Sequence, residues 1–283
     1  IMGNSTLNTR GRGGQNGQGG ITTLLGERIE LLDNTLVDAT GTTGGGEVHI
    51  GASPSLPLAE QSLPSLVNLG HQVRIAAGGN DLNSTATGGV LRISSAHGLL
   101  QAAHLSAPTI EVHTKNLIDM GQWDASAAGN GANQGGRITV NASGTVEQIQ
   151  SASWTVDGTA HTAAGTARIV AGLSAWVSGS ISAQGQLGGQ IAITAPDLVV
   201  AGAQLNANGD NGGGRIRVGG GWQGQSTDLT NANQTTVSGS TLQANAKQSG
   251  DGGEVVVWSE NRTLFGGEIQ ARGGDAAGNG GQV

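Results

Sequence analysis

Pairs of glycines recur along the chain, and each pair precedes a short stretch in which aliphatic and polar residues alternate. The pattern is Gly-Gly-x-h-x-h, where h is aliphatic. Its copies are Gly45-Gly46 with Val48 and Ile50, Gly88-Gly89 with Leu91 and Ile93, Gly135-Gly136 with Ile138 and Val140, Gly188-Gly189 with Ile191 and Ile193, Gly213-Gly214 with Ile216 and Val218, Gly252-Gly253 with Val255 and Val257, and Gly280-Gly281 with Val283. Alternation with period two predicts a strand with one buried face, and the glycines predict a turn before it.

A second pattern lies between these copies. It begins with an aliphatic residue or Trp, and it has an apolar residue five positions after that first residue, Ala seven positions after it and often Gly nine positions after it. Its copies begin at Leu32, Leu100, Ile118, Ile149, Trp176, Val200, Val237 and Leu264, and the copy at Ile149 replaces the Ala with Val156. The sixth position is polar in every copy: Asp38, Ser106, Asp124, Thr155, Ser182, Asn206, Gln243 and Gln270. This second strand therefore has one buried face and one in water.

The glycine pairs are spaced like the units of a solenoid. Gly188 and Gly213 lie about 25 residues apart, and Gly252 and Gly280 about 28. One such unit cannot bury its apolar face alone, so the units must stack, with strands pairing at a rise of ~4.8 Å. The sequence predicts an all-β parallel β-helix of roughly eleven to thirteen coils, about 50 to 60 Å long.

The period-two pattern also predicts which side chains point inward. The expected core positions are Ile138, Val140, Ile181, Ala183, Ile216, Val218, Val255, Val257, Ile269 and Ala271. Small residues suit a narrow core, and the corner glycines, Gly189 among them, are expected to hold a positive φ.

Two segments interrupt the period. Residues 52–68 contain Pro54, Pro57 and Pro64, which exclude a central strand, and residues 219–234 form a long polar stretch. Both are expected to be loop insertions in a single elongated domain spanning residues 1–283. They are also the expected regions of ligand contact, because solenoid insertions often form the binding face. Trp222, in the second insertion, is the aromatic ring most expected to be exposed.

Composition excludes several classes of protein. The chain has 52 Gly, and 20 Asp plus Glu against 13 Lys plus Arg give a net charge of −7, so the basic surface of a nucleic-acid or anionic-membrane binder is missing. There is no Cys, which excludes a disulfide scaffold and a Cys-based zinc site. No apolar run has the length of a membrane span.

The acidic, aromatic and histidine residues are the candidates for catalysis and metal binding. Asp119, Trp123 and Asp124 suggest two carboxylates beside a sugar-stacking ring, with Asp157 and Arg137 as further members of a glycan-active site. The repeat instead favours a structural role for these residues. Trp123 occupies a position that holds core residues in other coils, and Asp124 occupies the position that is polar in every copy. His97, His104 and His113 match no zinc spacing, and the segment 208–212 resembles an EF-hand opening without its Glu. We therefore assign no catalytic, cofactor-binding or metal-binding residues.

The segment from Gly212 to Gly281, and the earlier LLGERIELLDNTLVDATGTTGGGEVHIG from Leu24 to Gly51, resemble the repeat region of filamentous haemagglutinin-like exoproteins of two-partner secretion systems. The resemblance implies a right-handed parallel β-helix, export through a dedicated outer-membrane pore, and a role in adhesion or surface structure. The Asn-Pro-Asn-Gly motif of the family's N-terminal secretion domain does not occur, so that domain is not represented, and the chain is expected to be part of a longer exoprotein.

Three functions are compatible with these observations. The first is a secreted, cell-surface adhesin or structural exoprotein segment that is not an enzyme and whose receptor is a glycan or a protein. The second is a filament subunit that self-associates end to end, because the chain stops within a strand pattern at Gln282-Val283. The third is a β-helix polysaccharide lyase or hydrolase, which requires Asp119, Asp124, Asp157 and Arg137 to converge on one outer groove.

Overall fold

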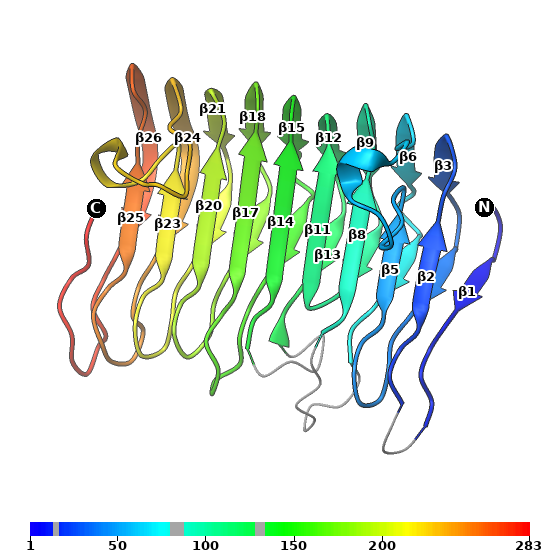
Figure 1. Ribbon diagram of the computed structural model, residues 1–283. Helices are drawn as coiled ribbons and strands as arrows, with labels where there is room; N and C mark the ends of the chain where they lie inside the picture. Colours follow the sequence, from blue (N-terminus) through cyan, green and yellow to red (C-terminus); the bar gives the residue numbers. More distant parts are fainter. Residues whose placement is uncertain (14–16, 80–87, 128–133) are drawn as a thin grey trace.

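The strands that follow the glycine pairs form one long parallel sheet, which we call face 1. The computed structural model describes residues 1–13, 17–79, 88–127 and 134–283. Face 1 has nine strands in chain order, and they run along the rod as shown in Figure 1. They are β2 (Ile21–Leu24), β5 (Glu47–Ile50), β8 (Val90–Ser94), β11 (Thr109–Thr114), β14 (Arg137–Ala142), β17 (Thr166–Ala171), β20 (Gln190–Thr194), β23 (Arg215–Val218) and β25 (Glu254–Val257).

In the described part of the chain, a second sheet of 17 strands supplies two further faces. Face 2 contains β3 (Arg28–Leu31), β6 (Leu66–Leu69), β9 (Gly98–Gln101), β12 (Asn116–Asp119), β15 (Thr145–Gln148), β18 (Ser174–Val177) and β21 (Asp197–Ala201). Face 3 contains β1 (Thr6–Asn8), β4 (Leu36–Asp38), β7 (Arg74–Ala76), β10 (His104–Ser106), β13 (Gln122–Asp124), β16 (Ser153–Thr155), β19 (Ser180–Ser182) and β22 (Gln204–Asn206). The long strands β24 (Gln234–Gln243) and β26 (Arg262–Gln270) pass through both faces.

Each coil therefore contributes one strand segment to each of three faces, and all the ladders are parallel. The register keeps equivalent residues on top of one another: Ile138 pairs with Ala167, which pairs with Ile191, which pairs with Ile216. This is the parallel β-helix that the repeat predicted.

The core is a continuous aliphatic column between the three faces. Of the ten residues predicted to point inward, seven are at most 1% exposed: Ile138, Val140, Ile181, Ala183, Ile216, Val218 and Val255. Val257 and Ile269 are partly buried against the same core, and Ala271 is also partly buried. Those three lie in the last coil, which has a neighbour on one side only, so the register is right and their exposure reflects position along the rod.

The rod has fewer coils than the sequence predicted. Nine face 1 strands within the described residues correspond to about 40 Å at the usual strand spacing, against the eleven to thirteen coils expected. The coils differ in length: the shortest runs from Val90 to its partner Thr109, whereas the coil from Glu47 to Val90 carries an insertion. Dividing the chain by a uniform period therefore overestimated the number.

Most of the glycine pairs are required for a different reason than the one expected from sequence, although Gly88 does have a positive φ of +76°. Gly188, Gly189, Gly213 and Gly214 do not have a positive φ. A Cβ atom on Gly188 would collide with the carbonyl oxygen of Ala207, and one on Gly189 with that of Gly165. At this corner the backbones of successive coils approach too closely for any side chain.

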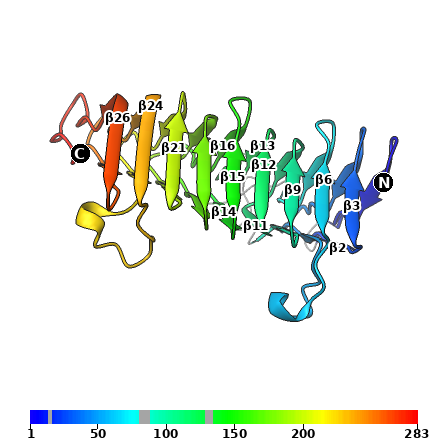
Figure 2. The same ribbon diagram turned by 90° about the horizontal axis from the view of Figure 1, so that it is seen from above.

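Both insertions leave the rod at the same corner, where face 1 turns into face 2. The first connects β5 to β6 and contains the 3₁₀ turn η1 (Leu58–Glu60), and the second connects β23 to β24 and contains η2 (Trp222–Gly224). Figure 2 shows the two loops projecting on the same side of the rod. Strand β6 begins at Leu66, inside the range 52–68 that the prolines suggested as loop.

Candidate functional surfaces

The acidic residues at the ends of face 3 strands stabilise the turns that follow them. Asp38 Oδ1 accepts a hydrogen bond from the Thr40 backbone N–H at 3.0 Å, and Asp124 Oδ1 accepts one from the Ser126 N–H at 2.8 Å. Asn206 does the same for the Asn208 N–H at 3.0 Å. This repeated contact between a side chain and the backbone two residues later accounts for Asp or Asn at these polar positions of the repeat.

The four residues required for a glycan-cleaving site lie in three different places. Asp119 is fully buried in the core, and Arg137 is the first residue of β14 on face 1. Asp124 ends β13 on face 3, and Asp157 follows β16, where its Oδ1 accepts hydrogen bonds from Ser182 Oγ and the Gln184 N–H, both at 2.7 Å. In the described structure, these four side chains therefore do not meet in one outer groove.

Asp119 instead belongs to an internal polar cluster that the sequence did not reveal. The indole N–H groups of Trp123 and Trp154 donate to its two carboxylate oxygens at 2.9 and 2.7 Å, and the Gly121 N–H donates at 3.1 Å. The two indole rings stack with centroids 4.7 Å apart. Burial raises the pKa of Asp119 to about 7, although the three hydrogen bonds oppose the increase. The prediction that Trp123 occupies a core position is correct, and its ladder neighbour Trp154 is buried with it; both are 1% exposed.

The neighbouring coils add two buried amides to this cluster. In the face 2 register, Gln101 and Gln148 flank Asp119. Gln101 is satisfied by the backbone of Ala103, at 2.7 and 3.0 Å. Among the residues that the structure describes, the amide of Gln148 has no hydrogen-bond partner for either its nitrogen or its oxygen, so it weakens the core rather than stabilising it.

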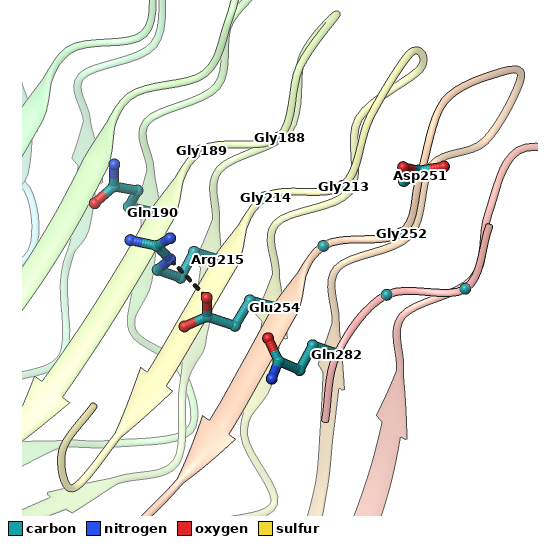
Figure 3. A pocket seen from close by; sticks show the side chains of 13 residues that line it. Gly188, Gly189, Gln190, Gly213, Gly214, Arg215, Asp251, Gly252, Glu254 and Gln282 are labelled. Atoms are coloured by element: carbon teal, nitrogen blue, oxygen red, sulfur yellow. Dashed lines mark ion pairs between the residues drawn. The ribbon is translucent and has the colours of Figure 1, made fainter. Parts of the chain in front are cut away.

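A groove of about 630 Å³ follows the glycine corner across several coils (Figure 3). Its floor is bare backbone at Gly188, Gly189, Gly213, Gly214 and Gly252, and the side chains of Gln190, Arg215, Glu254 and Gln282 stand along one side. Arg215 Nε and Glu254 Oε2 form an ion pair at 3.4 Å. The groove is thus a consequence of close coil stacking, bordered by a short row of polar groups that partly neutralise one another.

The insertion at residues 219–233 is fastened to the outer surface of face 1. Arg217, which is 8% exposed, donates to both carboxylate oxygens of Asp228 at 2.9 and 2.8 Å and to Ser226 Oγ at 3.0 Å. Arg168 donates to the Asp228 backbone carbonyl at 2.6 Å. The hydrogen bonds from Arg217 and from the Ser226 hydroxyl hold the pKa of the Asp228 carboxyl well below its usual range. The loop is anchored and presents Trp222, which is 47% exposed, as the sequence predicted.

The insertion after β5 is organised by one side chain. Gln61 accepts from the Ser53 N–H at 2.6 Å and donates to the carbonyl oxygens of Ser53 and Leu56 at 2.9 and 2.8 Å. Leu56 and Leu58 are exposed. Each insertion therefore carries large apolar side chains on a supported backbone.

A second exposed tryptophan lies on face 2 and was missed by the sequence reasoning. Trp176 and Val200 occupy the same place in the sequence motif, but the register pairs Val200 with Val177. Three residues, among them Gly202 with φ +69°, separate Val200 from Gln204, whereas two separate their register partners Val177 and Ser180. Such a one-residue shift moves a side chain to the opposite face. Trp176 consequently points outward and is 50% exposed.

The three histidines considered as a metal set are on separate elements. His104 lies on β10 in face 3, His113 on β11 in face 1, and His97 precedes β9. Across the described residues, no group of three or more His, Cys, Asp or Glu side chains is placed to hold a metal ion. Within the same part of the chain, no helix has the length and apolar character required to cross a membrane.

Comparison with known proteins finds similarity at the level of structure. The crystal structure of the HMW1 secretion domain from Haemophilus influenzae matches this chain with a TM-score of 0.49 and 14% sequence identity, over 93% of each chain. No protein-family model matches, and no curated protein matches the sequence. The chain itself folds as the parallel β-helix that its resemblance to two-partner exoproteins implies.

Proposed function

We propose that this chain is a rod-forming segment of a secreted bacterial exoprotein that serves in surface attachment or extracellular structure. The observation that carries the proposal is the unbroken stack of parallel coils around one aliphatic core, from which two anchored loops project at one corner. Such a rod holds binding groups at fixed positions away from a cell surface. The lack of Cys and the sequence resemblance support export through an outer-membrane pore protein.

An attachment assay tests this function. Beads coated with the purified chain are incubated with a panel of epithelial, bacterial and abiotic surfaces, and bound beads are counted with and without excess soluble protein. We expect saturable attachment to some of these surfaces that soluble protein competes away. Beads coated with albumin at equal density are the control. Attachment no greater than that control across the panel contradicts an adhesive role.

End-to-end assembly is a second candidate, favoured by the apolar side chains of the terminal coils. Phe265 on β26 continues the inward column of Val237 and is 45% exposed, and Leu24 on β2 at the other end continues the inward column of Ile50 and is only partly buried. Stacking of one copy on another would bury both. Sedimentation velocity over a range of concentrations should show oligomers that Phe265→Asp dissociates. A sedimentation coefficient that does not change with concentration contradicts assembly.

A further inference from the structure

Trp176 stands in a shallow groove on the outer surface of face 2. The groove has a volume of about 420 Å³ and is lined by Thr145, Glu147, Ser174, Trp176, Asp197 and Val199, together with the core residues Val146 and Ala175 between them. In the ladder, Glu147 lies beside Trp176 on one neighbouring coil and Val199 on the other. The lining residues thus come from three successive strands, β15, β18 and β21.

The indole ring is held in place although half of its surface is exposed. Its Nε1–H donates to Ser178 Oγ at 2.7 Å, two residues further along the same side of the chain. The hydrogen bond fixes the edge of the ring and satisfies its polar group, so the exposed part of the ring is apolar. A fixed aromatic surface loses little conformational entropy when a ligand packs on it.

The rim of the groove offers hydrogen-bond acceptors. Glu147 and Asp197 are exposed, and within the described residues neither carboxylate has an ion pair or a side-chain hydrogen bond. They lie on the two coils that flank Trp176, and the hydroxyl groups of Thr145 and Ser174 lie on the same strands as Glu147 and Trp176. The described residues that line the groove include no Lys, Arg or His.

We propose that the Trp176 groove binds a neutral oligosaccharide. A pyranose ring has a face of C–H groups that packs on an aromatic ring, and a rim of hydroxyl groups that donate to carboxylates. An anionic sugar would meet two carboxylates without a compensating cation. A quaternary ammonium ion is typically enclosed by several aromatic rings, and this groove has one.

The same ladder extends the apolar surface beyond the groove. Leu100 pairs with Ile118, which pairs with Glu147, and Ile118 is 43% exposed. A pyranose unit is similar in length to the ~4.8 Å rise of a coil. A saccharide lying along the rod axis would therefore place successive units over Trp176 and towards Ile118, so binding should strengthen with chain length.

This inference rests on the proposed attachment function, and a direct binding experiment separates the two. The purified chain is titrated by calorimetry with neutral tetrasaccharides of glucose, mannose and N-acetylglucosamine, with an oligogalacturonate and with choline. We expect saturable binding of at least one neutral tetrasaccharide, weaker binding of its disaccharide, and none of the oligogalacturonate or choline.

Three variants test the assignment of the site. Trp176→Ala should weaken binding roughly tenfold or more because the stacking surface is lost, whereas Trp176→Phe should retain most of it. The double variant Glu147→Gln and Asp197→Asn should weaken binding without changing the ring. Trp222→Ala is the matched control, because that ring has similar exposure on a different surface. Circular dichroism and melting temperature verify that each variant is folded.

The proposal is overturned if no neutral tetrasaccharide binds, if Trp176→Ala binds as well as the parent, or if choline or the oligogalacturonate binds more tightly. If beads coated with Trp176→Ala attach as well as beads coated with the parent, the glycan site is refuted and the attachment function is retained. Attachment lost in Trp222→Ala and retained in Trp176→Ala would likewise place recognition in the insertion loop and overturn the inference.

Discussion

The buried carboxyl of Asp119 should make the central coils more stable in mild acid than at neutral pH. In the unfolded chain this group titrates near its ordinary pKa of 3.8, whereas in the folded chain burial raises the pKa to about 7. Between these values the folded state holds a proton that the unfolded state has released. The free energy of unfolding therefore falls as pH rises from about 4 to about 7 and is constant above that range.

The magnitude follows from the size of the shift. Each pKa unit corresponds to about 1.4 kcal/mol, so the stability of these coils should be about 2 kcal/mol greater at pH 5.5 than at pH 7. Asp228 does not disturb this window. Its folded pKa is lowered, so its contribution is present above the unfolded value of 3.8 and is lost only as pH falls below that value.

Urea unfolding followed by tryptophan fluorescence measures the effect, because Trp123 and Trp154 report on the coils that contain Asp119. Asp119→Asn is the control. Its amide offers one acceptor to two indole N–H donors, so it should lower stability by about 1 to 3 kcal/mol and remove this carboxyl's share of the pH dependence. The difference between the two proteins cancels the titration of all other groups. The reasoning is refuted if that difference does not change between pH 5.5 and 7.

Four other substitutions test the packing and the loop anchor. Ala183→Leu should overfill the core and cost about 1 to 3 kcal/mol, measured by urea unfolding, while hydrogen exchange near Val255 stays slow because coils contact only their neighbours. Gly189→Val should destabilise the same coils through collision with the backbone of the preceding coil, and unchanged stability would contradict the close-approach explanation. Gln148→Met should stabilise by about 1 kcal/mol because it removes a buried unpaired amide; a lower urea midpoint would show that the amide has a partner. Arg217→Met should speed proteolysis within residues 219–233 without changing the urea midpoint of the rod, and equal cleavage rates would argue against the anchor.

The register of the fold could be predicted from sequence because a parallel ladder repeats the same physical requirement in every coil. Ile138, Ile191 and Ile216 face the same column, so each copy of the motif reinforces the others. The polar sixth position was also predictable, although its capping role at Asp38 and Asp124 was not.

Features that depend on a single turn were not predictable from the repeat. One additional residue near Gly202 causes Val200 to point inward, whereas Trp176 points outward. Spacing counted along the chain treats the two residues as equivalent. Asp119 stands where neighbouring coils carry Gln101 and Gln148, and its partners come from two different coils. Such contacts are set by stacking geometry rather than by sequence spacing.

The common corner of the two insertions fixes the distance between them. The loops follow β5 and β23, which are six steps apart in face 1, so their bases are separated by roughly 30 Å along the rod. A small ligand can contact one loop at a time, whereas an array of receptors with matching spacing can contact both. Simultaneous contact would make the second binding event intramolecular and raise avidity without any new interaction. The length of the rod then determines which receptor spacing both loops can contact together. Adding or removing whole coils between β5 and β23 would change that spacing.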